Sequence, residues 1–181
     1  MVHGESSVEA ALRPGEPPYL NRFILVNKAA RTLTLIENGE AGASFPVLIG
    51  KNPGPKERMG DDRTPEGDLH VAQMLPDEAA VGAGYYKGLH ISYPHPEHAA
   101  VGRSLGLIDE DVEKEVVRAF EAGEITPQVS ALGGEVAIHA GLAPDELFVR
   151  GTRGCVVMRN ADMDVVYAFA CQGMRILITP N

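Results

Sequence analysis

Short β-rich runs separated by turn signals constrain the fold of this chain more than any other feature of its sequence. Each run is rich in β-branched and apolar residues, and Gly, Pro or Asn lie near most of the boundaries between runs. The runs cover residues 22–27, 31–37, 44–50, 68–74, 88–94 and 174–180. The first three follow one another through short turns, which predicts a β-meander. Residues 51–67 are crowded with Gly, Pro and charged side chains and predict a long loop.

Two other segments carry a helical pattern. Residues 109–122 begin with acidic side chains, place Val112, Val116 and Phe120 at helical spacing, and end before a glycine. A second helix is expected from about Asp162, whose carboxylate suits a first helical turn. The sequence therefore predicts a mainly β fold, a mixed β-sheet or sandwich, with one or two helices.

Length and charge limit the domain organisation and the partners. A chain of 181 residues fits one domain, expected at residues 21–181, while residues 1–20 lack periodicity and are expected to form a tail or linker. The formal net charge of -9 opposes binding to a polyanion, so nucleic acid is not an expected partner. The first residues have neither the basic start nor the apolar stretch of an export signal.

The two cysteines stand in very different surroundings. Cys155 lies in the Gly-rich polar stretch G-T-R-G-C, whereas Cys171 follows the apolar run V-V-Y-A-F-A. We expect Cys171 to be a small buried core residue. The spacing of the pair permits a disulfide but does not indicate a disulfide framework.

The loop before Cys155 contains the ingredients of a reactive thiol. Arg153 precedes the cysteine by two residues, Arg150 and Arg159 lie close in sequence, and a glycine lets the backbone bend toward a carbonyl oxygen. Among six histidines, His139 at the end of an apolar strand is the best placed base. On the residues alone, an inert thiol and a histidine that only satisfies its own strand end remain an open alternative.

Four motifs follow one another in a recognisable order. T-P-E-G and L-H-I-S-Y-P come first, then I-H-A-G, and finally T-R-G-C-V-V-M-R-N-A-D. Together they resemble the L,D-transpeptidase catalytic-domain family, in the branch with periplasmic murein transpeptidases and a related amidase. The resemblance spans about residues 22–179, and the matching positions are Thr64, Pro65, Gly67, His139, Thr152, Gly154, Cys155, Met158, Asn160 and Asp162.

The resemblance implies cysteine-dependent acyl transfer on peptidoglycan stem peptides. Cys155 attacks the carbonyl that links the diamino-acid residue to the terminal D-alanine, and His139 takes the thiol proton and later protonates the leaving amine. The thioester then passes to an amine of a second stem peptide. Backbone amides near Gly154 and Cys155 hold the oxyanion, and Thr152 supports the His139 ring or the substrate.

The chain departs from the family pattern at two positions. Val157 stands where the family often has an arginine, so any substrate-orienting task of that arginine is absent or moves to Arg153 or Arg159. Ala140 replaces the glycine that usually follows the histidine, a change that affects local loop geometry.

Further residues are candidates for substrate or metal binding. His90 and Tyr93 lie in L-H-I-S-Y-P and Arg63 lies in the long loop, so each is a candidate substrate contact, with a packing or hairpin role as the alternative. His95 and His98 have a spacing that suggests metal ligands, but no cysteine or acidic partner nearby completes a set. The sequence predicts no metal and no cofactor, and it carries no signal for an oligomeric state.

Two other functions remain open. The same Cys155 and His139 pair can pass the acyl group to water, as an amidase or L,D-carboxypeptidase does. A non-catalytic cell-wall-binding module is the second alternative, and the missing arginine at Val157 is its only support. The resemblance implies a location in the periplasm or cell envelope, for which we expect an export signal to have been trimmed.

Overall fold

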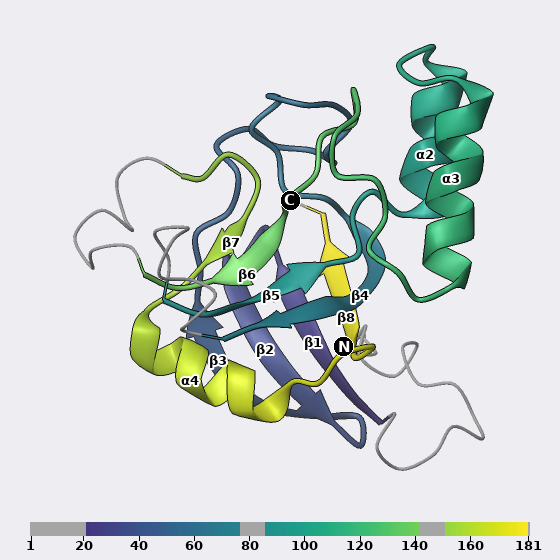
Figure 1. The fold of residues 1–181 in the computed structure, drawn as a ribbon. Helices are drawn as coiled ribbons and strands as arrows, with labels where there is room; N and C mark the ends of the chain where they lie inside the picture. Colours follow the sequence, from purple (N-terminus) through teal and green to yellow (C-terminus); the bar gives the residue numbers. More distant parts are fainter. Residues whose placement is uncertain (1–20, 77–85, 142–150, 181) are drawn as a thin grey trace, which may run out of the picture.

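A computed structural model describes residues 21–76, 86–141 and 151–180. The strands of these residues are β1 (Arg22–Asn27), β2 (Thr32–Glu37), β3 (Glu40–Pro46), β4 (Gly67–Leu75), β5 (Gly88–Ile91), β6 (Ala137–His139), β7 (Val156–Val157) and β8 (Arg175–Thr179). The helices are α2 (Pro96–Ser104), α3 (Glu110–Glu121) and α4 (Asn160–Phe169). Figure 1 shows α4 on one side of the sheet, with α2 and α3 packed against each other on the other side. In the described residues, no helix is long and apolar enough to cross a bilayer.

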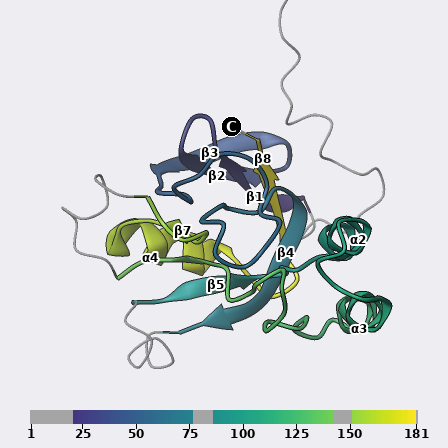
Figure 2. The same ribbon diagram turned by 90° about the horizontal axis from the view of Figure 1, so that it is seen from above.

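The strands form one mixed sheet in the order β3-β2-β1-β8-β4-β5-β6-β7. The β1–β8 and β6–β7 pairs are parallel, and the other pairs are antiparallel. The sheet is curled, which brings β2 and β3 to one side and β4 and β5 to the other in Figure 2. The mainly β, mixed-sheet prediction is therefore confirmed.

The segment after β3 closes the curl by pairing with β7 and with the loop before it. Leu48 and Val157 exchange two backbone hydrogen bonds, at 2.8 Å and 2.9 Å. Thr152 N donates to Ile49 O at 2.8 Å, and Lys51 N donates to Thr152 O at 3.0 Å. The two ends of the sheet thus meet at the residues that lead into Cys155.

The main core lies inside the curl. Inward-facing apolar side chains of the sheet fill it, and α4 adds Met163 and Val166. A smaller cluster joins α2 to α3 through Ala99 and Val116 and packs on Leu132. The long loop 51–67 and the loop before β7 lie together at one end of the sheet, where the Thr64 hydroxyl donates to Gly154 O.

Most predicted elements are present, with local shifts. The first two strands and α3 match their predicted ranges closely, and α3 is capped by Asp109, whose side chain accepts from Val112 N. The third strand, β3, starts at Glu40 directly after the turn and ends at Pro46, and Leu48 and Gly50 form isolated bridges beyond it. Helix α4 begins at Asn160, two residues before the predicted start. The predicted tail, 1–20, lies outside the described residues.

Helix α2 was not predicted, and Cys171 was predicted wrongly. Pro96 follows the predicted strand at residues 88–94 and occupies the first turn of α2, where a missing N–H costs no hydrogen bond. His95 caps that helix by accepting from Glu97 N. Cys171 is exposed because α4 ends at Phe169 and the chain then turns toward β8. In the apolar run before it, only Val166 is buried, whereas Val165 is exposed.

Candidate active site around Cys155

Hydrogen bonds of two threonines fix the loop that carries Cys155. The Thr152 hydroxyl donates to Cys155 O at 2.6 Å and accepts from Gly154 N at 3.0 Å. From the long loop, the buried Thr64 hydroxyl donates to Gly154 O at 2.9 Å and accepts from Gly50 N at 2.8 Å. Each hydroxyl satisfies two backbone groups, so the position of Cys155 depends on both loops at once.

Gly154 is required by its own backbone and by its neighbour. Its φ of +139° lies in a region that residues with a Cβ avoid. A Cβ at this position would also lie 2.9 Å from Arg63 O. The glycine therefore lets the Cys155 loop approach the long loop closely enough for the Thr64 hydrogen bond.

Strand register brings the predicted thiol and base to the same face of the sheet. In the parallel β6–β7 pair, His139 is opposite Val157 and Ile138 is opposite Val156, so Cys155 lies level with Ala137. Because side chains alternate along a strand, Cys155 and His139 share one face, while Ile138 points into the core.

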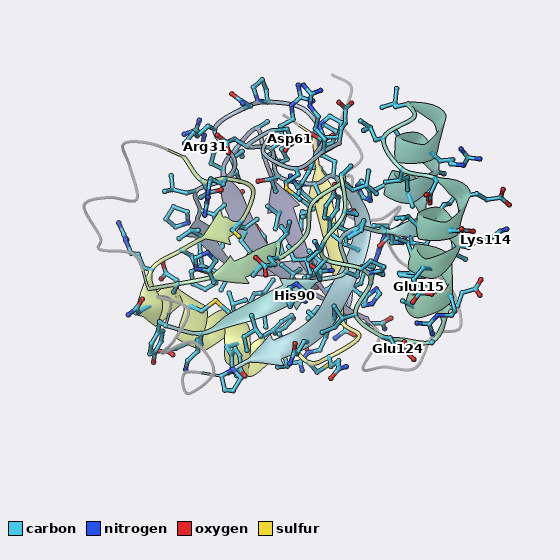
Figure 3. The ribbon with its side chains drawn as sticks, turned by 45° about the horizontal axis from the view of Figure 1, so that its top comes forward. Arg31, Asp61, His90, Lys114, Glu115 and Glu124 are labelled. Carbon is cyan, nitrogen blue, oxygen red and sulfur yellow. The ribbon has the colours of Figure 1, made fainter. Side chains whose placement is uncertain are left out.

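β5 adds two positions to this face. His90 is opposite Ala137, and Gly88 is opposite His139. A Cβ on Gly88 would lie 2.9 Å from the His139 Cβ and 2.7 Å from Ile138 O, so the glycine makes room for the histidine. His90 lies on β5 near the middle of Figure 3, and its buried Nδ1 has no hydrogen-bond partner. Burial lowers the pKa of His90, although Gln128 and the negative charge of Glu135 raise it in part.

The Cys155 thiol is held in its uncharged form. Its Sγ donates to Glu135 O at 3.7 Å. Burial raises the pKa of the thiol, and the nearby negative charge of Glu135 raises it further. A backbone hydrogen bond from Ala137 and the positive charges of Arg153 and Lys56 lower the pKa but do not offset burial.

The His139 imidazole is also uncharged near neutral pH. Burial lowers its pKa, and the hydrogen bond between Nδ1 and Ala140 O, 3.1 Å long, raises the pKa by less. A carbonyl oxygen can only accept, so this contact assigns the proton to Nδ1 and leaves the lone pair on Nε2. The site therefore combines a neutral thiol with a neutral imidazole, the protonation states that general-base catalysis starts from.

A buried ion pair under the site was missed by the sequence interpretation. Lys56 Nζ donates to Asp61 Oδ1 and to Arg58 O, each at 2.9 Å, and both side chains of the pair are about 95% buried. Burial favours a raised pKa for Asp61, but hydrogen bonds from Lys56 and from three backbone N–H groups lower it overall. The charge-rich sequence of this loop was the available signal, and it was interpreted only as a loop.

Glu135 and Gln128 were also missed. Glu135 has a φ of +55°, unusual for a residue with a side chain, and its carbonyl accepts the thiol hydrogen bond. Gln128 fixes this geometry, because its Oε1 accepts from Glu135 N at 2.6 Å and its Nε2 donates to Tyr93 O at 2.9 Å. Nothing local in the sequence marks either residue, since the contacts join separate loops.

Several predicted site residues have other partners. Tyr93 is fully buried and its hydroxyl donates to Leu132 O at 3.0 Å, which matches the packing alternative, and its contact with substrate stays a prediction. Arg63 forms an ion pair with Glu57 at 3.2 Å inside its own loop. The Thr152 hydroxyl donates its proton to Cys155 O within the loop, and its predicted support of the His139 ring or the substrate stays a prediction.

The structure also changes the predicted oxyanion donors. The N–H of Gly154 is occupied by Thr152, so it does not face a substrate. The N–H of Cys155 has no hydrogen bond to any described residue and remains available as a donor. Arg153 and Arg159 are exposed on either side of the cysteine, and Arg150 lies outside the described residues.

His95 and His98 take part in packing. His98 lies edge-on to Tyr93, and His95 lies edge-on to Phe120, with ring centroids 4.9 Å and 4.5 Å apart. His98 Nε2 is also 3.1 Å from Glu66 O. In the part of the chain that the structure describes, no three His, Cys, Asp or Glu side chains form a group that could hold a metal ion.

The model of the L,D-transpeptidase catalytic domain (YkuD) matches residues 21–178. The chain belongs to this family. The match covers every strand and helix described above except the last residue of β8, and it includes the Cys155 loop and His139. Among curated proteins, none matches the sequence significantly.

Solved structures share the fold at low identity. Bd1075 of Bdellovibrio bacteriovorus is 22% identical with a TM-score of 0.59, over 88% of this chain and 48% of that one. The helical cell shape determining protein Pgp2 of Campylobacter jejuni is 18% identical with a TM-score of 0.54, over 92% and 52%. A mutant of the Enterococcus faecium L,D-transpeptidase is 14% identical with a TM-score of 0.52, over 88% and 50%. The chain therefore spans about half the length of these proteins.

Within the family pattern, Val157 is the main departure. Its side chain is 1% exposed and packs on Leu48 in a small cluster that includes Cys155. The position that often carries an arginine is thus an apolar wall beside the thiol.

Proposed function

We propose that this domain is a cysteine L,D-transpeptidase that acts on peptidoglycan stem peptides in the cell envelope through a thioester acyl-enzyme. The observation that carries the proposal is the shared face of Cys155 and His139, the first on the loop before β7 and the second on β6. Family membership over residues 21–178 supports the coarse activity, and the thiol chemistry is our inference from the site.

The reaction begins with both groups uncharged. As the Cys155 Sγ forms a bond to the scissile carbonyl carbon, its proton moves to Nε2 of His139. The oxyanion accepts a hydrogen bond from the Cys155 N–H, the backbone donor that is available next to the sulfur. When the intermediate collapses, the amide C–N bond breaks and His139 returns the proton to the departing D-amino acid.

The thioester is then resolved by a second nucleophile. An amine of another stem peptide attacks the carbonyl carbon, gives up a proton to His139, and displaces the Cys155 sulfur, which takes the proton back. Water in place of the amine gives hydrolysis. The neutral resting pair suits both outcomes, because the same base activates either nucleophile.

The charge distribution supports an anionic substrate. The protein as a whole carries -9, yet Arg153 stands beside Cys155 without an ion pair to any described residue. Arg153 is close enough to influence the pKa of the thiol. A stem peptide ends in a carboxylate, which a cation at this position attracts through Coulomb interaction.

Acylation by a carbapenem tests the thiol chemistry directly. Opening of the β-lactam ring by Sγ breaks the ring C–N bond, adds the whole inhibitor to the protein and is read by intact mass. We expect the adduct on the wild-type protein and on Cys171→Ser, and no adduct on Cys155→Ser. Cys171 is the matched control because it is the more exposed thiol. A folded wild-type protein that gains no mass would remove the proposal and favour a non-catalytic wall-binding module.

Purified muropeptides test the acceptor. Transfer predicts a crosslinked dimer whose mass equals two stems minus one D-amino acid. Shortened monomers without dimer would replace the transpeptidase with a carboxypeptidase or amidase that uses the same Cys155 and His139. Both outcomes must disappear in Cys155→Ser.

A further inference from the structure

A cavity of about 230 Å³ lies beside the Cys155 loop and takes no part in the mechanism above. It is enclosed by the β1–β2 turn, the segment after β3 and the junction between β7 and α4. Its apolar wall is formed by Val47, Leu48, Val157 and Met158. These side chains give the cavity a mostly apolar interior of a size that admits one small residue and not a drug-sized ligand.

Two arginines line the same cavity. Arg31 enters it from the β1–β2 turn and Arg159 from the start of α4, and both are exposed. Arg31 lies at the same end of the molecule as Asp61 in Figure 3, yet it forms no ion pair with any residue that the structure describes. Two guanidinium groups next to an apolar wall suit a ligand that combines a carboxylate with a small apolar group.

The start of α4 adds to this positive potential. Arg159 is the N-cap residue and makes no side-chain capping bond, so the first N–H groups of the helix have no capping acceptor from it. Asp162 in the first turn reduces the potential, but it does not line the cavity. Arg31 and Arg159 are thus the two charged residues that line the cavity.

The cavity and the Cys155 side chain share two neighbouring residues. Leu48 and Val157 belong to its wall, and the same two side chains pack with Cys155. Val157 follows Cys155 by two residues on one strand face, a separation of about 7 Å at 3.3 Å per residue. That distance corresponds to about two residues of extended peptide, so a chain end held here can keep its neighbouring carbonyl near Sγ.

We propose that this cavity binds the C-terminal residue of the donor peptide, with its carboxylate on Arg31 and Arg159 and its small side chain on Leu48 and Val157. The inference rests on the proposed function, because the peptide bond next to that residue is the one that Cys155 attacks. It assigns substrate selection to residues from the β1–β2 turn and the α4 start, which are 128 positions apart in the numbering. A terminal carboxamide or a bulky terminal residue does not fit.

Binding to a small probe tests the site without turnover. We suggest titrating N-acetyl-D-alanine and its carboxamide into Cys155→Ala protein and following the guanidinium and methyl signals by NMR. We expect saturable shifts with the carboxylate, at least tenfold weaker binding of the carboxamide, and a similar loss in Arg31→Gln and Arg159→Gln. Arg118→Gln on α3 is the matched control, because Arg118 pairs with Glu115 and Glu124 on that surface.

Steady-state kinetics with a D-alanine-terminated stem peptide separates the two proposals. Arg31→Gln and Arg159→Gln should raise KM about tenfold or more, with a smaller change in kcat, and the Arg118→Gln control should match wild type. Unchanged KM and unchanged probe binding in both variants would overturn the cavity inference while turnover keeps the proposed function. Probe binding that depends on both arginines, in a wild-type protein that neither acylates nor turns over, would keep the cavity and reject the proposed function.

Discussion

Replacing Thr64 with valine should both destabilise the fold and displace the nucleophile loop. Thr64 is 0% exposed, and its hydroxyl serves Gly154 O and Gly50 N. Valine has nearly the same shape, so it leaves these two backbone groups buried without a partner. Each unsatisfied group costs about 1–3 kcal/mol, so the two together cost about 2–6 kcal/mol of stability. Losses of this size are a large fraction of the stability of an ordinary domain.

The matched variant is Thr64→Ser, which keeps the hydroxyl and loses one buried methyl group, at a cost of about 1 kcal/mol. Both variants should be made in Cys171→Ser protein, where Cys155 is the remaining thiol. Urea unfolding gives the free energies, and the rate of carbapenem acylation in the absence of urea reports the position of Cys155. We expect slow acylation in the valine variant and near wild-type acylation in the serine variant. Equal stability and equal acylation in the two variants would refute the role assigned to the hydroxyl.

Three further predictions concern histidines and their neighbours. Burial lowers the pKa of His98 to about 4 from an ordinary value of 6.5, so the unfolded chain binds the proton more tightly than the folded one. About 3 kcal/mol of stability should therefore be lost as pH falls from about 6.5 to about 4. Thermal melts of wild type and His98→Gln across this range measure the loss. Because burial also lowers the pKa of His139 from its ordinary value of 6.5, the second-order acylation rate should rise with pH and level off, with its midpoint below pH 6.5. A midpoint above neutrality would contradict this base. Gly88→Ala should displace the strand that carries His139, because the added Cβ would meet the His139 Cβ and Ile138 O. We expect a large fall in the acylation rate with a small loss of unfolding free energy, measured by acylation and urea unfolding on the same protein.

Local periodicity explains how much of the fold the sequence could predict. The strands and α3 have patterns that fit within a dozen residues, so each could be located without knowledge of its neighbours. Pro96 shows the limit, because the same residue ends a strand or starts a helix, and the choice depends on whether His95 caps the helix that follows. Cys171 shows the second limit, since its exposure depends on where α4 ends.

The candidate site divides in the same way. Cys155 and His139 could be proposed from short motifs, whereas their common face follows from the parallel register of β6 and β7. Tyr93 lies two residues after β5, and its direction into the core is set by a carbonyl of a distant loop. Lys56 affects the thiol from 99 residues away in the sequence, and Glu135 affects it from 20 residues away through its backbone carbonyl and its charge. Residues of this kind need a structure to be recognised.

Because the resting Cys155 thiol is uncharged, the cations near it are not needed to stabilise a thiolate. A preformed thiolate at Cys155 would need stabilisation by cations throughout the catalytic cycle, but burial keeps the thiol protonated against the influence of Arg153 and Lys56. Lys56 is already paired with Asp61, so its charge is largely balanced inside the fold. Arg153, which has no ion pair to a described residue, can therefore attract a bound carboxylate, and proton transfer to His139 accompanies the attack itself. Substitution of Arg153 should accordingly affect KM more than the rate of carbapenem acylation.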